Sequence, residues 1–349
     1  MARPTVFLHV GTRKSATTYL QLGLKASRGA LAAEGVQVAA LTQSDFKHLV
    51  PGLRRWANFG EEQGGRLAVD YLVQQLQRRP GRAQVVSVEA LAELPGYVVD
   101  DLVTAVTSAG FDVQVIVTAR HWGLIIPSEW QQRIKQRGTQ TYADFVAAIR
   151  DGGDDLFVRR QDLADIARRW GALIPPERVH VIACPPPTRT EGTLLELFCG
   201  ILGVPTSLIT PPSRVVNSSL SLAQAETLRR VNLALGDRLP RRTGGYESGV
   251  RNWITRESLT RHKGEKVLLP EGFGSWCAAE SRRQVDELRD LGVHLAGRVD
   301  DLLASPDVPT GPVEVDDAEV AEVAVLALAD LADHRWHQLH PDDEIQDGR

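Results

Sequence analysis

An apolar, strand-like run near the start of the chain leads into a loop that carries positive charge and hydroxyl groups. The loop begins at Gly11 and reads GTRKSATT, and an apolar-periodic, helix-like stretch follows it. In a strand–loop–helix unit, the backbone N–H groups and the helix N-terminus bind anions. Arg13 and Lys14 add positive charge, and the hydroxyls of Thr17 and Thr18 can bond an anion's oxygens. The sequence therefore predicts a site for a phosphate-type anion in this loop.

This loop does not have the spacing of the Walker A motif, GxxxxGK[ST]. Its lysine comes three residues after Gly11 instead of six, and Ala16 and Thr17 stand where that motif has glycine and lysine. No strand of the sequence ends in a clear aspartate of the Walker B type, which would hold magnesium. A magnesium-dependent, nucleotide kinase-like P-loop enzyme is therefore disfavoured and is kept as an alternative.

The loop resembles the 5′-phosphosulfate-binding loop of sulfotransferases, which use 3′-phosphoadenosine 5′-phosphosulfate (PAPS). The family pattern after a strand is P-K-[ST]-G-T-T. The positions that match it are Lys14, Ser15, Thr17 and Thr18. Arg13 replaces the proline and Ala16 replaces the glycine. If position 16 requires a positive φ, alanine costs about 1 kcal/mol or more, whereas a helical backbone accepts it. The resemblance implies that residues 13–18 bind PAPS.

A second signature of the same family follows the third predicted strand. Sulfotransferases bind the 3′-phosphate with an arginine at a strand end and a serine eight residues later, and Arg120 and Ser128 have this spacing. A guanidinium offers a fork of donors to a phosphate dianion, and a serine near the first turn of a helix adds a hydroxyl. The resemblance therefore implies that these two residues bind the other end of PAPS.

Sulfuryl transfer can proceed by positioning and electrostatic stabilisation, without a metal ion. The resemblance assigns Lys14 to the charge that develops on the departing 5′-phosphate of 3′-phosphoadenosine 5′-phosphate (PAP). The acceptor hydroxyl needs a general base, and relatives use a histidine or a glutamate after the second strand. Glu89 stands at that strand end and is the first choice, with His48 as the second. His9 and His121 are interpreted as bracing residues.

Two later segments resemble the actinobacterial branch of the family. They are Asn217–Leu220 and the run LLPEGFGSW over 268–276. The resemblance extends over most of residues 5–303 and implies a small-molecule acceptor, with a natural product as the expectation. Its variable acceptor-binding segments would lie over 40–65 and 240–275.

The elements that must position these residues alternate between strands and helices. Continuous apolar runs predict strands over 5–10, 83–88, 113–119 and 178–183, and residues 36–65 are read as irregular. The predicted helices cover parts of 19–35, 65–79, 98–109, 124–137, 142–150, 161–170, 193–202, 222–235, 277–291 and 317–334. Apolar strands that alternate with helices predict an α/β fold, a P-loop-type parallel sheet with helices on both faces. Ligands bind such sheets at the carboxyl ends of the strands.

Composition narrows the class of protein. The 349 residues include 40 lysines and arginines against 44 aspartates and glutamates, a net charge of −4, and 43% are apolar. This balance excludes disordered, collagen-like and disulfide-scaffold proteins, and a nucleic-acid partner is not expected. No run approaches the roughly 20 apolar residues of a membrane span. The three cysteines have no CxxC spacing, so we expect buried thiols, no metal and a cytoplasmic location.

The sequence is therefore interpreted as one α/β sulfotransferase domain over 1–304, a proline-rich linker over 305–316, and a C-terminal helix with a polar tail over 317–349. That helix could be a dimer contact, a lid or ordinary packing, so a homodimer stays open. The predicted function is PAPS-dependent sulfuryl transfer to a hydroxyl or similar nucleophile of a small molecule. A catalytically inactive nucleotide-binding protein on the same fold is a further alternative.

Overall fold

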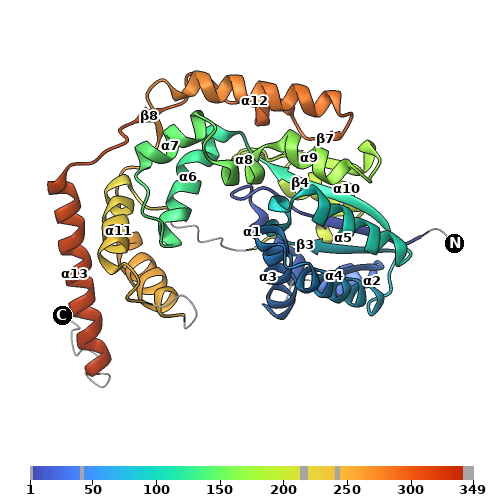
Figure 1. Cartoon of the computed structure of the whole chain (residues 1–349), viewed down its shortest axis with the longest axis horizontal. Helices are drawn as coiled ribbons and strands as arrows, with labels where there is room; N and C mark the ends of the chain where they lie inside the picture. The colour runs from blue at the N-terminus through green and yellow to red at the C-terminus, as the bar shows by residue number, and fades with distance from the viewer. Residues whose placement is uncertain (1–2, 40–42, 213–218, 240–243, 341–349) are drawn as a thin grey trace. The chain divides into compact units, whose positions relative to one another are not determined.

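The structure is a computed structural model (Figure 1). It describes residues 3–39, 43–212, 219–239 and 244–340. Asn217 and Ser218, which carry part of the predicted resemblance, lie outside the described residues, as do 40–42 and 240–243 of the two variable segments.

The chain forms two compact units. The first comprises Met1–Ile125, Asp154–Val215 and Ser275–Pro306, and the second comprises Ile126–Gly153, Val216–Gly274 and Asp307–Arg349. Each unit is described by itself.

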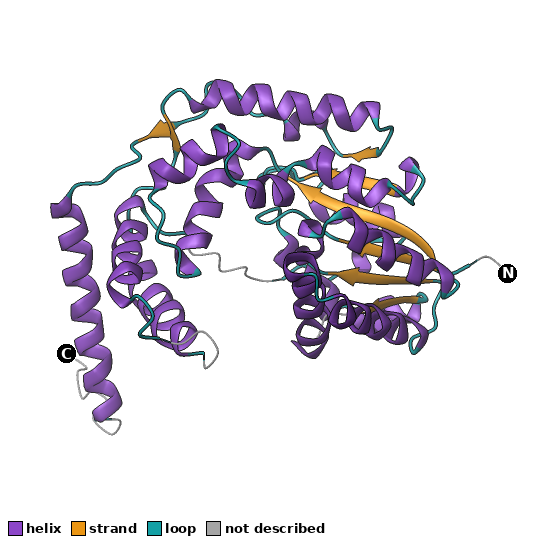
Figure 2. Cartoon of the chain, viewed as in Figure 1, coloured by secondary structure: helices purple, strands orange, loops and turns teal. Residues whose placement is uncertain are grey.

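The first unit is built on a six-stranded sheet in which every neighbouring pair of strands is parallel (Figure 2). The strands in spatial order are β2 (Val36–Ala39), β3 (Ala83–Ser87), β1 (Thr5–His9), β4 (Asp112–Ala119), β5 (Val179–Ala183) and β7 (His294–Ala296). The four strands predicted from apolar runs are β1, β3, β4 and β5, and they form the centre of the sheet. The short strands β2 and β7 at its edges were not predicted.

Helices cover both faces of this sheet, which confirms the predicted fold class. Successive side chains of a strand point to opposite faces, so Phe7 and Ile116 belong to one apolar cluster while Leu8 and Val115 belong to the other. The first cluster is closed by α1 (Thr17–Ala26), α2 (Arg28–Ala33) and α10 (Leu194–Leu202). The second is closed by α3 (Gln43–Phe59), α4 (Glu62–Gln77), α5 (Gly96–Ser108), α9 (Leu163–Gly171) and α12 (Phe273–Asp290).

The expectation of irregular structure over 36–65 is wrong, because β2, α3 and the first turn of α4 lie there. Pro51 is inside α3, where a proline ordinarily disfavours a helix. Packing compensates: Trp56 of α3 lies so close to Gly65 of α4 that a Cβ there would be 2.2 Å from its ring. The glycine therefore allows the two helices to approach closely.

The second unit is mainly helical. Its elements include most of α6 (Trp122–Lys135), then α7 (Tyr142–Arg150), α11 (Leu222–Leu235), the π-helix η5 (Glu247–Ser258) and α13 (Asp317–Leu339). The predicted linker contains β8 (Thr310–Gly311), which pairs with β6 (Leu269–Pro270). The remaining helix of the first unit, α8 (Asp155–Gln161), and the 3-10 turn η1 (Glu89–Glu93) flank the candidate site.

Candidate anion-binding site at the strand ends

Three of the predicted site segments follow neighbouring strands of the sheet. The loop from Gly11 follows β1, Glu89 follows β3 and Arg120 follows β4, and β1 lies between the other two strands. Since all three strands are parallel, their carboxyl ends lie at one edge of the sheet. This edge is where open α/β sheets bind ligands.

The loop starts as an extension of the sheet. The N–H groups of Val10 and Thr12 donate to the carbonyl oxygens of Ile116 and Thr118, at 3.0 and 2.9 Å. Gly11 between them has a φ of +46°, and a Cβ there would be 2.5 Å from Cγ2 of Thr17. A side chain at position 11 would therefore displace the first turn of α1, which explains why the tight turn contains glycine.

Lys14 and Ala16 both have left-handed backbone conformations, with φ of +66° and +62°. Position 16 could have had a helical backbone or a positive φ, and the structure has the positive φ, which is strained for alanine. For residues other than glycine such conformations cost about 1–2 kcal/mol each, and they gather at ligand-binding sites. The strain thus marks the loop as a candidate functional element.

The N-terminus of α1 faces the loop without a competing side-chain cap. Within the described part of the chain, the N-cap residue Ala16 makes no side-chain cap hydrogen bond, and the first turn contains no acidic residue. Its N–H groups and the positive end of the helix dipole are therefore suited to a bound anion.

A buried row of hydrogen-bonded polar side chains connects the loop to the strands of the sheet. His9 is fully buried, and its Nδ1 and Nε2 lie 2.7 Å from Oγ of Ser87 and 3.2 Å from Oγ1 of Thr118. Ser15 in the loop continues the row, with its Oγ 2.8 Å from Oγ1 of Thr118 and 2.5 Å from the carbonyl oxygen of Thr12. The predicted bracing role of His9 fits these contacts, because they join β3, β1, β4 and the loop.

Burial lowers the pKa of His9 from 6.5 to about 3. An unfolded chain therefore takes up a proton at His9 below about pH 6.5, while the folded chain does not until about pH 3. We expect the free energy of unfolding to fall with decreasing pH in this window, by up to about 1.4 kcal/mol per pH unit for this group. Urea unfolding at pH 7.5 and 5.5 measures the slope. The slope should be shallower in His9→Gln, and an unchanged slope would contradict the assignment.

Glu89 is held at the loop by two contacts. The hydroxyl of Thr17 donates to its Oε2 at 2.6 Å, and Nε of Arg13 lies 3.6 Å from its Oε1. The carboxylate is about one-third exposed, so it is accessible from solvent. Glu89, the first candidate for the general base, therefore lies directly beside the predicted anion-binding loop.

Cys184, which follows β5, is a buried residue that contacts the same loop and is influenced by Arg120. The pKa of the Cys184 thiol is raised to about 11, chiefly by burial, while the positive charge of Arg120 opposes the rise. The thiol also donates to the carbonyl oxygen of Ser15, at 3.4 Å. The buried thiol thus contacts the loop and lies within the electrostatic influence of Arg120.

His121 follows Arg120 and has a buried Nδ1 with no hydrogen-bond partner among the described residues. Burial, and secondarily the charge of Arg120, lower its pKa to about 4. A buried ring nitrogen without a partner is uncommon and is consistent with a ligand or water that completes the site. His121 is therefore a stronger candidate than its predicted bracing role implied.

The two remaining predicted site residues lie on helices. Ser128 is half-buried in the second unit, and it is the seventh residue of α6 because that helix begins at Trp122, two residues earlier than predicted. His48 is exposed on α3, and its ring packs against that of Tyr71 of α4, with centroids 5.0 Å apart and the planes tilted by 35°. The contacts described for His48 thus lead to α4, whereas those of Glu89 lead to the loop.

Sequence reasoning missed two supports of the site. Nε2 of Gln161 donates to the carbonyl oxygen of Arg13 at 3.3 Å, and the indole of Trp122 donates to the Gln161 carbonyl at 2.9 Å. No local pattern marks Gln161, which is 148 residues from its partner. Thr118 was also missed, although its place two residues before Arg120 in a strand could have indicated it.

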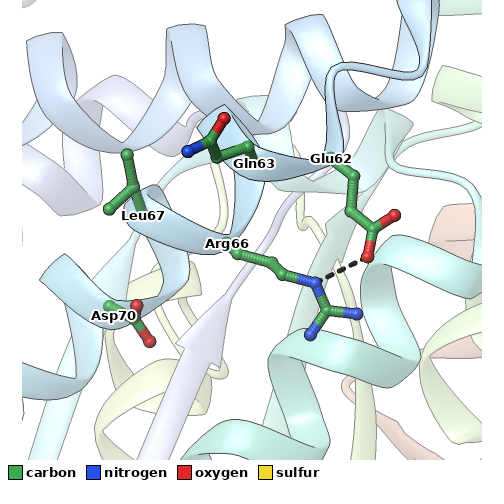
Figure 3. Close-up of a pocket in the computed structure, with 5 residues that line it drawn as sticks. All are labelled: Glu62, Gln63, Arg66, Leu67 and Asp70. Atoms are coloured by element: carbon green, nitrogen blue, oxygen red, sulfur yellow. Dashed lines mark hydrogen bonds and ion pairs between the residues drawn. The ribbon is translucent and has the colours of Figure 1, made fainter.

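Two surface hollows lie outside the loop. One follows β5 and β7 and is lined by residues 188–192, Gly297 and Arg298, with Arg189 paired to Asp301. The other lies on α4 (Figure 3). It is lined by Glu62, Gln63, Arg66, Leu67 and Asp70. Arg66 donates to Glu62 at 2.7 Å within this second hollow, which contains none of the residues after the strand ends.

Among the described residues, no group of three or more histidine, cysteine, aspartate or glutamate side chains could hold a metal ion. None of the helices within the described ranges is long and apolar enough to cross a membrane.

No family model matches the chain, and no curated protein matches it. Among solved structures, the chain is similar to the crystal structure of a sulfotransferase from Alicyclobacillus acidocaldarius, with 18% sequence identity and a TM-score of 0.40. The match covers 68% of this chain and 96% of that chain. Similarity this low leaves the function to be inferred from the chain's own residues.

Proposed function

We propose that the chain is a sulfotransferase that moves a sulfuryl group from PAPS to a hydroxyl of a small molecule. The observation that carries the proposal is the strained, lysine-bearing loop at an uncapped helix N-terminus, which follows β1 and is hydrogen-bonded to the end of the neighbouring strand β4, directly before Arg120. An anion loop and a second cationic group at one sheet edge suit a ligand with two separate phosphate groups. The resemblance of the sequence to PAPS-binding motifs indicates that this ligand is PAPS.

In this proposal the loop from Arg13 to Thr18 binds the 5′-phosphosulfate through its N–H groups, charges and hydroxyls. Arg120, with Ser128, binds the 3′-phosphate. The spacing of the Arg120 and Ser128 motif supports this assignment. The Nδ1 of His121, for which the described residues offer no hydrogen-bond partner, is a further donor or acceptor for the same ligand. The chemistry of these donors fits a nucleotide that carries phosphate at both ends.

The reaction needs a nucleophile, a base and stabilisation of the leaving group. The acceptor oxygen forms a bond to sulfur, the bond from sulfur to the 5′-phosphate oxygen breaks, and the hydroxyl proton passes to the Glu89 carboxylate. Lys14 stabilises the negative charge that grows on the departing oxygen of PAP. We propose Glu89 rather than His48 as the base, because Glu89 contacts Thr17 and lies beside Arg13 in the loop.

Calorimetry with PAP and with ATP, each with and without magnesium, tests the proposal. We expect PAP to bind without magnesium and ATP to bind no better in its presence. Arg120→Ala should weaken PAP binding by about 10- to 100-fold, since hydrogen bonds to charged groups contribute about 1.5–3 kcal/mol.

Two other outcomes would replace the proposal. A clear preference for magnesium-bound ATP would favour the kinase-like alternative. Tight PAP binding with no turnover across a broad panel of hydroxyl acceptors would favour an inactive nucleotide-binding protein on this fold.

A further inference from the structure

The long helix α13 packs against its own unit with one face only. Figure 1 shows α13 beside α11 in this unit, and α13 contacts α11 and η5. Val320 is its buried apolar residue, and Asp330 accepts hydrogen bonds from Ser258 and His262. These residues define the inner face of α13.

The opposite face carries a row of apolar residues, here named the α13 seam. Its members are Ala321, Val325, Leu328, Ala332, Trp336 and Leu339. All six are exposed, Val325 by 64% and Leu328 by 63%. At 100° per residue the six side chains fall within about 80° of arc, and the seam is about 27 Å long. Soluble helices ordinarily bury such a stripe, so the α13 seam requires an occupant.

The side chains of the α13 seam are complementary in size to those of the same seam on a second copy of the helix that runs antiparallel to the first. With two copies antiparallel and centred near residue 330, Ala321 faces Leu339, Val325 faces Trp336, and Leu328 faces Ala332. Each large side chain then meets a smaller one, as close packing requires. A parallel pair would instead put Trp336 on Trp336 and Ala321 on Ala321.

The charges of α13 favour the same direction. Its first turns carry Asp317, Glu319 and Glu322, whereas its last turns carry Arg335 and the pair of His337 with Asp333. Antiparallel copies keep the two acidic ends apart, which a parallel pair would bring together, and the opposite helix dipoles also attract.

We propose that the α13 seam is the interface of a homodimer, in which two copies of the chain pair antiparallel about a two-fold axis. A two-fold interface uses the same patch on both subunits and must be self-complementary. The α13 seam meets this requirement in both volume and charge. The inference does not depend on sulfuryl transfer, because it uses no residue of the candidate site.

Analytical ultracentrifugation of the full chain over a concentration series tests the dimer. The wild type is expected to be a dimer at micromolar concentration, and Leu328→Asp should be a monomer with an unchanged circular dichroism spectrum. Leu233→Asp is the matched control, because Leu233 lies on α11 of the same unit and is 53% exposed. A monomeric wild type, or a dimer that survives Leu328→Asp, would overturn the proposal.

Disulfide cross-linking tests the direction of the pair. The native cysteines are Cys184, Cys199 and Cys277; all three are buried, and burial raises the pKa of each thiol to about 11 or above. Introduced cysteines should therefore react selectively. A mixture of Ala321→Cys and Leu339→Cys chains should form a covalent dimer on oxidation, and neither variant should do so alone. In each variant alone the two thiols would be about 27 Å apart, far beyond disulfide range. Self-cross-linking of either variant would refute the antiparallel arrangement.

Discussion

Replacing Lys14 with alanine is expected to lower kcat by about 100- to 1000-fold and to change the affinity for PAPS, which does not yet carry the leaving-group charge, much less. The proposed role of its amine is to stabilise charge that exists only as the bond from sulfur to the leaving oxygen breaks. Loss of one such preorganised donor costs about this factor in other enzymes. An interaction made only in the transition state lowers kcat and kcat/KM together, so steady-state kinetics at saturating PAPS is the measurement.

The backbone at the same position supplies a second readout. Because Lys14 has a φ of +66°, Lys14→Gly should raise the free energy of unfolding by about 1 kcal/mol while it abolishes turnover. Ala16→Gly is the control, since it relieves the same kind of strain at φ +62° and retains the amine. That control should be more stable and fully active. Wild-type turnover in Lys14→Ala would remove the lysine from the mechanism.

Glu89→Gln is expected to lower kcat by about 100- to 10,000-fold, the range that general-base catalysis contributes. The amide retains an oxygen that can accept the Thr17 hydrogen bond, so the loop should keep its shape and its affinity for PAP. A fall in kcat with unchanged PAP binding therefore separates the loss of a base from the loss of a structural contact.

Two further variants complete this experiment. Glu89→Ala also removes the acceptor for Thr17, which now makes a 2.6 Å hydrogen bond, so it should weaken PAP binding as well as turnover. His48→Asn should be active. Full activity of Glu89→Gln together with an inactive His48→Asn would transfer the base role to His48.

The centre of the fold could be predicted because its strands are buried on both faces. Continuous apolar runs such as VFLHV and VQVIVTA are typical of such strands, and β1 and β4 lie where they predict. The edges could not be predicted in this way. β7 has three residues and begins with the exposed His294, so it carries almost no pattern.

The helix α3 shows a different limit of sequence reasoning. Pro51 and Gly52 stand next to each other in its sequence, and both residues are ordinarily signals that a helix ends. The helix persists because it packs tightly on α4, where Gly65 accommodates Trp56. Contacts between segments override local propensity here, and a single sequence does not reveal them.

The sequence could predict which residues lie at the candidate site, but not the contacts that connect them. Placing Lys14, Glu89 and Arg120 after neighbouring strands required only the strand pattern and the rule that parallel strands share a carboxyl edge. The backbone conformation of Ala16 remained open, because alanine is compatible with both a helical and a strained position. The contact of the Cys184 thiol with the Ser15 carbonyl oxygen joins two parts of the chain that lie 169 residues apart, and no local pattern predicts it.

The pairing of β1 with β4 continues past the end of β1, because the N–H of Thr12 still donates to the carbonyl oxygen of Thr118. The loop and the residue that follows β4 are thus attached to one rigid ladder, whose strands are about 4.8 Å apart. Under the proposed function, the distance between the two anionic groups bound at this edge is set when the chain folds. A ligand that is shorter or longer than that distance would then engage one end only, so the ladder would select ligands by length.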